Sequence, residues 1–201
     1  TYNKYIHPIH LEYDNPKYWE LINKKEVLSL FQFLDAPSGV QAIDMIQPTS
    51  LAELADINSV LRLMAADGRE TPLNVYKKRK HNIGLWYDEM SLIGLNEKEV
   101  KILEDHVGIT KGMCITQEQL MALVQDKRIS GFTFGEADYV RKVMGKKKLK
   151  EIPKVHEKFV RQGLEIGNRR VFMDYIWNEL FAVQLGYAFS IIHTVSYSIV
   201  A

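Results

Sequence analysis

Helix-capping patterns recur along this chain and constrain it to a helical fold. A Ser, Thr or Asn followed three residues later by Glu or Gln forms a capping box, which satisfies free backbone N–H groups at a helix start. Four such pairs precede apolar residues at three- and four-residue spacing, which is typical of one buried helix face. The pairs are Ser50 with Glu53, Asn96 with Glu99, Thr116 with Gln119, and Thr133 with Glu136.

The residues after these caps set the length of each predicted helix. The Ser50 helix carries a stripe from Leu54 to Met64 and is expected to run past Arg62 toward Gly68. Three more helices are predicted on caps and periodicity. The first begins near Pro153, the second runs from about Arg170 to Gln184, and the third begins at Ser190.

Strand signals are sparse. Only Ile9–Tyr13 and Leu28–Phe33 have short β-like runs, and each is equally compatible with an extended connector. Asp67–Leu73 and Gly108–Met113 are the expected loops. The sequence therefore predicts a mainly α, irregular multi-helix fold with at most a few short strands near the N-terminus.

Composition is that of an ordinary globular protein. Of 201 residues, 46% are hydrophobic and 25% charged, and the single Cys114 excludes an internal disulfide framework. The first residues lack the apolar core of a signal peptide. We therefore expect a cytoplasmic protein. Apolar residues without a helix stop end the chain, which predicts a fragment of a longer protein.

A segment without Asp, Glu, Lys or Arg raises a membrane alternative. Leu180–Ala201 is a run of 22 residues without a charged side chain, and a run of this length can span a bilayer. Gln184, Ser190 and His193 interrupt it, which favours a buried helix pair and no membrane partner.

Positive charge is concentrated locally. Residues 141–150 carry six cationic side chains and no acid, in a chain of formal net charge +1. A polyanion is the natural partner of such a patch, and a solvated helix end is the alternative. A second cluster, Lys77–Lys80, is a solvated loop when considered alone, but two clusters together favour a surface that follows phosphates.

No complete catalytic or metal site is found among the motifs. His106 and Cys114 do not have a standard zinc spacing. His193 and Tyr197 are four apart on one helix face, with Phe189 just before it, and can stack on a base. Considered alone, residues of this kind are more often part of a buried core. We predict no catalytic residue and no metal ligand in this chain.

Five segments in order resemble the fingers region of a C-family replicative DNA polymerase, the catalytic alpha subunit of bacterial DNA polymerase III. They cover nearly the whole chain, and the fourth is the most specific. They are LFQF (Leu30–Phe33) with Gly39; Ala55, Leu61 and Arg62 with YKKRKH (Tyr76–His81); TQEQLM (Thr116–Met121); SGFTFGEADYVRKVMGKKK (Ser130–Lys148); and GYAFSIIHTVSYSIVA (Gly186–Ala201).

Three departures from the family pattern indicate a divergent branch, such as a phage or prophage polymerase. Leu63–Ala65 stand where the family has Pro-Gly-Pro, Lys142 replaces the second Arg of a pair, and Ser190–Ile192 replace Asn-Lys-Ser. The first departure also removes a helix stop after Arg62.

The resemblance implies specific roles for the site residues. Arg141, Lys142 and Lys146 would contact the triphosphate of the incoming dNTP, and Phe189, His193 and Tyr197 would face the nascent base pair. Arg62 and Gln117 are further candidates. Gln117 and Glu118 match a family motif without a derived chemical role, and packing and network support are expected of them. The DNA backbone would be held by Lys147, Lys148, Lys150, Lys78, Arg79 and Lys80.

The resemblance also implies a domain layout and partners. The whole chain, 1–201, would be a fingers domain, with residues 1–49 as a connector from the palm and a small lobe, and 50–201 as helical fingers. Its partners would be primer-template DNA, dNTP, and the palm and thumb of the parent polymerase. The palm would hold two Mg²⁺ ions, so the isolated chain is expected to be inactive. The alternative is a non-enzymatic helical nucleic-acid-binding module.

Overall fold

The capping residues begin helices at the positions that the sequence predicts. The computed structural model describes residues 12–13, 15–26, 33, 36–65, 68–186 and 189–200. Asn96, Thr116 and Thr133 each form a complete capping box. Within these residues no β-strand forms, and the only bridge is an isolated one between Thr116 and Phe189. The mainly α prediction is confirmed.

The chain divides into two compact units, Thr1–Leu61 with Ile192–Ala201 and Arg62–Ile191. The predicted division into 1–49 and 50–201 stays a prediction. The described helices of the first unit are α1 (Pro16–Lys24), α2 (Pro37–Ile46), α3 (Leu51–Val60) and nearly all of α11 (Ile191–Val200). The second unit contains α4 (Pro72–His81), α5 (Gly84–Ile93), α6 (Glu97–Val107), α7 (Gln117–Gln125), α8 (Phe134–Gly145), α9 (Ile152–Ile166), α10 (Arg170–Tyr175), a π-helix (Ile176–Phe181) and a 3-10 turn (Ala182–Gln184).

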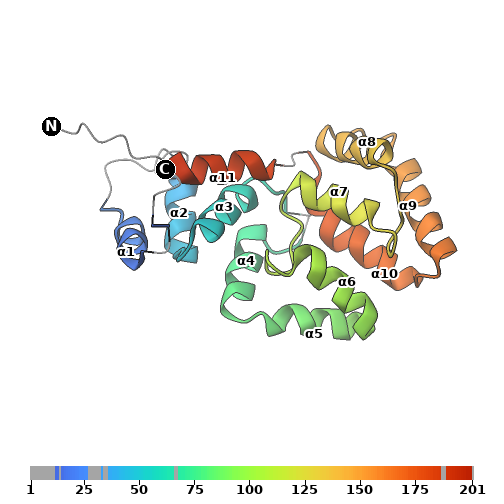
Figure 1. Cartoon of the computed structure of the whole chain (residues 1–201), viewed down its shortest axis with the longest axis horizontal. Helices are drawn as coiled ribbons and strands as arrows, with labels where there is room; N and C mark the ends of the chain where they lie inside the picture. Colours follow the sequence, from blue (N-terminus) through green and yellow to red (C-terminus); the bar gives the residue numbers. More distant parts are fainter. Residues whose placement is uncertain are drawn as a thin grey trace. The chain divides into compact units, whose positions relative to one another are not determined.

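The second unit has a continuous apolar core beneath its helices. In Figure 1, α7 lies beside α8, and the two pack closely; α9 packs against α8 and α10. Trp86, Phe159, Phe172 and Phe181 are fully buried in the shared core. In the first unit, α2 packs against α1 and α3. Burial of one apolar stripe from each helix accounts for most of the stability of such helices.

The helix from Ser50 ends earlier than predicted. Ser50 caps α3 by accepting from the Glu53 N–H, but the helix stops at Val60, and the expectation that it continues past Arg62 is wrong. Just after the helix, the Met64 N–H donates to the Val183 carbonyl, 3.1 Å away, which is a contact outside the helical pattern. Met64, the last residue of the predicted stripe, is exposed.

Several elements differ from the sequence-based expectation. Lys77–Lys80 lie within α4 rather than in a loop, and α4 begins at Pro72, so the loop predicted to reach Leu73 ends earlier. Ile9–Tyr13 and Leu28–Phe33 fall almost entirely outside the described residues. The predicted helix from Arg170 to Gln184 is continuous in the chain but changes from α to π and then to 3-10 geometry.

The membrane alternative receives no support from the described helices. Within the described residues of Leu180–Ala201, the π-helix ends at Phe181, the 3-10 turn spans Ala182–Gln184, and α11 spans Ile191–Val200. In the part of the chain that the structure describes, no helix combines the length and apolarity needed to cross a bilayer.

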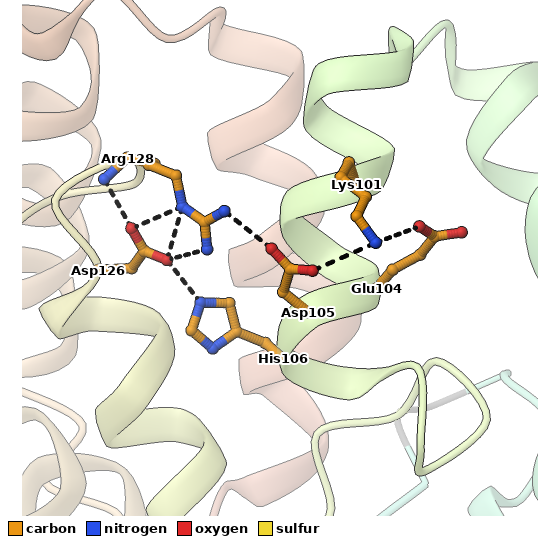
Figure 2. Close-up of polar contacts among 6 residues, drawn as sticks. All are labelled: Lys101, Glu104, Asp105, His106, Asp126 and Arg128. Atoms are coloured by element: carbon orange, nitrogen blue, oxygen red, sulfur yellow. Dashed lines mark hydrogen bonds and ion pairs between the residues drawn. The ribbon is translucent and has the colours of Figure 1, made fainter.

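A partly buried ion network ties α6 to the turn that follows α7. Figure 2 shows the Asp126 carboxylate between the Arg128 guanidinium and the His106 ring, with the Arg128 Nη2 atom at 2.6 Å and the His106 Nε2 atom at 2.7 Å. Arg128 also reaches Asp105 on α6, at 2.8 Å. Burial alone would raise the pKa of Asp126, but the hydrogen bonds from Arg128 and His106 outweigh it and hold this pKa well below its usual value.

Substitution Asp126→Ala is expected to lower the free energy of unfolding by about 2 kcal/mol, because it leaves partly buried donors without an acceptor. A depressed folded-state pKa means that this stability is present above the usual Asp pKa and is lost as the pH falls through the folded-state value. Urea unfolding at neutral and acidic pH measures both effects. Asp174→Ala, which breaks an exposed pair with Arg170, is the control and should cost under about 0.5 kcal/mol. Equal losses for the two variants would contradict the prediction.

Candidate functional site

One carboxylate on α8 holds two of the predicted triphosphate-binding cations. Asp138 lies three residues before Arg141 and four before Lys142, so all three side chains project from the same helix face. Arg141 donates to Asp138 Oδ1 through Nε at 3.0 Å and Nη2 at 2.6 Å, while Lys142 Nζ lies 2.6 Å from Oδ2. Hydrogen bonds from Lys142 and Arg141 lower the pKa of Asp138. Two cations around one ionised carboxylate leave a net positive charge at this position.

The side chain of Arg141 also connects α8 to α7. Its Nη1 atom donates to the Oε1 atom of Gln117, at 3.1 Å. The Arg141 side chain is 29% exposed and the Lys142 side chain 52% exposed. Arg141 is thus the more constrained of the two cations, and both remain accessible to an anion.

The lysines that follow α8 form an exposed cationic turn. Lys146, Lys147, Lys148 and Lys150 are all exposed. Lys148 lies 3.2 Å from the Glu151 carboxylate, whereas no ion pair is found for the other three within the described residues. The left-handed backbone of Lys147, with φ of 46°, reverses the chain here. This turn therefore presents ammonium groups to solvent on several sides.

Gly186 packs directly against this turn. Its N–H donates to the Met144 carbonyl at 3.0 Å, and its φ of +97° lies in the left-handed region. A Cβ atom at Gly186 would lie 2.2 Å from Cε of Lys147. Glycine at this position thus lets the chain after the 3-10 turn approach the end of α8 closely.

Phe189 and Arg62, two sequence-predicted site residues, contact each other. The Arg62 guanidinium carbon lies 4.6 Å from the centre of the Phe189 ring, which is cation–π distance. Phe189 is 6% exposed, and its carbonyl accepts from the Gln117 N–H at 3.0 Å. Arg62 itself is exposed. The structure thus assigns Arg62 a partner that the sequence did not indicate.

Glu118 binds the residues at the start of α11. Its Oε1 atom accepts from the Ser190 hydroxyl at 2.7 Å, and its Oε2 atom accepts from the Ile191 N–H at 2.9 Å. The sequence predicts Ser190 as the N-cap of this helix. The first N–H of the helix, that of Ile191, donates to the side chain of Glu118, which α7 supplies from 73 residues away.

His193 and Tyr197 lie on one face of α11, as their spacing predicts. Their ring centres are 6.0 Å apart with an angle of 29° between the planes. Both belong to the first compact unit, whereas Arg141, Lys142 and Phe189 belong to the second.

The three predicted DNA-contacting residues of α4 lie in different environments. Lys78 is largely exposed and pairs with Glu70 at 2.7 Å, and Lys80 is half-buried. Arg79 is buried and donates to Glu89 at 2.7 Å and to the Gly112 carbonyl at 2.9 Å. DNA contacts of these residues stay predictions, but the Arg79 guanidinium already has a set of partners inside the protein.

His106 and Cys114 are occupied by separate interactions. His106 contacts Asp126, and Cys114 is fully buried, with its sulfur 3.0 Å from the Gln184 amide nitrogen. Burial raises the pKa of the Cys114 thiol, which disfavours the reactive thiolate. Among the described residues, no group of three or more His, Cys, Asp or Glu side chains could hold a metal ion.

Comparison with known proteins identifies the family of this chain. Residues 1–167 match the family described as the bacterial DNA polymerase III alpha subunit finger domain. Over all 201 residues the chain is 43% identical to the probable DNA polymerase YorL of Bacillus subtilis (strain 168) and to a DNA-directed DNA polymerase of Bacillus phage SPbeta. It is 30% identical to the DNA polymerase III subunit alpha of Aquifex aeolicus (strain VF5), over 98% of the chain.

The matched region is a small part of these relatives. The chain spans 15% of the length of the first two and 16% of the third. The phage SPbeta protein shows that the chain has a phage-encoded homologue, in line with its departures from the family pattern. The match over residues 1–167 includes the α8 cations and the cationic turn, and the chain belongs to the finger-domain family of the bacterial DNA polymerase III alpha subunit.

Proposed function

We propose that this chain is the fingers region of a template-directed DNA polymerase and binds the incoming dNTP through Arg141, Lys142 and Lys146. The observation that carries the proposal is the Asp138 carboxylate, which is held by both Arg141 and Lys142. Phosphate oxygens accept the same charge-assisted hydrogen bonds as carboxylate oxygens. The two cations are therefore arranged around a position that suits an anionic oxygen.

The contribution of such a domain is positioning and electrostatic. Phosphoryl transfer depends mainly on the placement of the reacting groups and on stabilisation of negative charge. Arg141 and Lys142 would orient the triphosphate and neutralise part of its charge, and Phe189, His193 and Tyr197 would form the surface for the nascent base pair. None of these residues is proposed to make or break a covalent bond.

We place the divalent metal chemistry outside this chain. The described residues contain no cluster of acidic side chains that could bind a metal ion, and we propose that carboxylates of the palm hold two Mg²⁺ ions. When bound, these ions would supply charge neutralisation at the reacting phosphate. The chain by itself is accordingly expected not to extend a primer.

The cationic turn after α8 is proposed to follow the DNA backbone. Lys147, Lys148 and Lys150 are exposed, and two of them have no ion pair in the described part of the chain. The palm, the thumb and primer-template DNA are the proposed partners. The 43% identity to two DNA polymerases supports this assignment.

Substitution Lys142→Ala in the full-length polymerase tests the triphosphate assignment. Loss of one charge-assisted hydrogen bond should raise KM for dNTP by about 10-fold with a smaller effect on kcat. The measurement is steady-state incorporation on a fixed primer-template. Lys154→Ala removes an equivalent exposed charge from α9 and should leave KM unchanged. An unchanged KM in Lys142→Ala would refute the role of this residue.

Neutralising the turn tests its binding to DNA. In a Lys147→Gln, Lys148→Gln, Lys150→Gln variant, the affinity for primer-template should depend less steeply on salt. The slope of log affinity against log salt should become shallower by about 0.9 for each phosphate that the turn no longer neutralises. Fluorescence anisotropy of labelled DNA over a salt series measures the slope. Lys101→Gln is the control, because Lys101 pairs with acidic residues on α6. An unchanged slope in the triple variant would exclude phosphate binding by the turn.

A further inference from the structure

A continuous chain of side-chain hydrogen bonds runs across the N-terminus of α7. It begins at Arg141 on α8, whose Nη1 atom donates to Gln117 Oε1 at 3.1 Å. Gln117 Nε2 then donates to Glu118 Oε1, at 3.3 Å. Glu118 in turn accepts from Ser190 and from the Ile191 N–H. These hydrogen bonds thus join Arg141, the strongest candidate for phosphate binding, to the segment that follows Phe189.

The main chain of α7 reinforces this connection. The Gln117 N–H donates to the Phe189 carbonyl, next to the bridge between Thr116 and Phe189. One residue, Gln117, therefore contacts Arg141 through its side chain and Phe189 through its backbone. A change in the position of Phe189 must move Gln117 or break this hydrogen bond.

Several hydrogen bonds anchor the first turn of α7 from below. Gln119 accepts from the N–H groups of Ile115 and Thr116, at 2.9 and 3.2 Å, and donates to the Thr110 hydroxyl at 2.8 Å. The buried Gln184 amide donates to the Cys114 and Thr116 carbonyls, at 2.8 and 2.9 Å. Because these bonds anchor the turn to the core, Gln117 and Glu118 have a fixed base from which to orient other groups.

The residue types suit a relay. The Gln117 amide has an acceptor at one end and a donor at the other, so it can accept from a cation and donate to a carboxylate at once. A glutamate at this position would still pair with Arg141 but would repel Glu118. Glu118 accepts from three donors, namely an amide, a hydroxyl and a backbone N–H, and both of its carboxyl oxygens are used.

We infer that Gln117 and Glu118 form a positioning relay that couples Arg141 to the Phe189–Ile191 segment. The consequence for nucleotide selection rests on the proposed function. If Arg141 binds the triphosphate and Phe189 forms part of the base-pair surface, the relay makes the position of the Arg141 side chain depend on the position of Phe189. Correct and mismatched dNTPs then differ in how well Arg141 is placed, so Gln117 and Glu118 are specificity-determining positioning residues.

Hydrogen exchange tests the relay without reference to nucleotides. In the full-length polymerase, Gln117→Ala and Arg141→Ala should each speed exchange of the Ile191 amide by roughly threefold to tenfold, the range expected for coupling through a contiguous network. Lys142→Ala is the matched control. Lys142 pairs with Asp138, as Arg141 does, but among the described residues Arg141 bonds to the Gln117 side chain and Lys142 does not. Unchanged exchange in both relay variants would overturn the relay.

Kinetics of correct and mismatched dNTP incorporation test its role in selection. The near-isosteric Gln117→Glu should lower kcat/KM for the correct dNTP by about 10-fold, mainly through a higher KM. It should lower kcat/KM for a mismatched dNTP by a smaller factor, so the discrimination between the two falls. Combining Gln117→Ala with Arg141→Ala should cost less than the product of the single effects. Equal losses for both dNTPs, or multiplicative effects, would refute the selection role.

The two tests separate the two ideas. If Arg141→Ala leaves dNTP use unchanged, the triphosphate assignment fails, and the Ile191 exchange rates still decide whether the relay exists. If Gln117→Ala loses helical circular dichroism, Gln117→Glu supplies both measurements, because it keeps the size of the side chain and the pairing with Arg141.

Discussion

Substitution Arg141→Ala is expected to lower kcat/KM for dNTP incorporation by about 100-fold in the full-length polymerase. This factor corresponds to about 3 kcal/mol, the value of two charge-assisted hydrogen bonds to phosphate. Arg141 should have a larger effect than Lys142, because it is held between Asp138 and Gln117 and so loses less side-chain freedom when it binds. Steady-state incorporation of a single correct dNTP measures the change.

Two further variants make this result specific. Arg141→Lys keeps the charge but not the planar fork, and should lose roughly 10-fold. Arg161→Ala removes an exposed guanidinium from α9, whose nearest acidic partner, Glu165, lies at 3.9 Å, and should leave kcat/KM unchanged. A polymerase that uses dNTP normally after Arg141→Ala would refute the proposed triphosphate site.

Substitution Gly112→Ala is expected to cost about 3 to 4 kcal/mol of unfolding free energy. Gly112 has φ of +73°, which disfavours any side chain by about 1 to 2 kcal/mol. A Cβ atom there would also lie 2.3 Å from Cδ2 of Trp86, a fully buried ring whose Nε1 donates to the Tyr175 hydroxyl at 3.0 Å. Because the ring has no space to retreat, overpacking adds about 1 to 3 kcal/mol.

Gly94 provides the matched control for this prediction. Its φ of +81° is similar, but no atom lies within 4 Å of the place its Cβ would occupy. Gly94→Ala should therefore cost only about 1 to 2 kcal/mol, from the backbone alone. Urea unfolding followed by circular dichroism measures both variants, and the difference between them reports the contact with Trp86. A Gly112→Ala loss no larger than that of Gly94→Ala would contradict the prediction.

Helices with a polar cap and a clear apolar stripe were predictable from the sequence. The boxes at Asn96, Thr116 and Thr133 form as expected, and α11 begins next to Ser190. α1, α2, α4 and α5 were missed, although α1, α2 and α4 each have a proline in the first turn. Asn15 before Pro16 and Thr71 before Pro72 were usable start signals. α4 was hidden because most of its residues are polar, and only Pro72, Tyr76 and Arg79 are buried.

The candidate site was predictable only in part. The cations of α8 follow from residue types and spacing, and the pairing of Asp138 with Arg141 and Lys142 is a local i,i+3 and i,i+4 contact. The contact of Arg62 with Phe189 joins residues 127 positions apart, and the Met64 N–H, just after the early end of α3, donates to the distant Val183 carbonyl. Such long-range contacts leave no periodic signal in the chain.

The sequence by itself determined the helical class, most helix starts and the position of the cationic turn after α8. These depend on interactions within four residues, such as caps and apolar spacing. Only the tertiary structure decided that Gln117 meets Arg141, that Glu118 binds the start of α11, and that Arg79 is buried. Those outcomes depend on which helices pack together, because packing alone brings donors and acceptors from distant parts of the chain within hydrogen-bond distance.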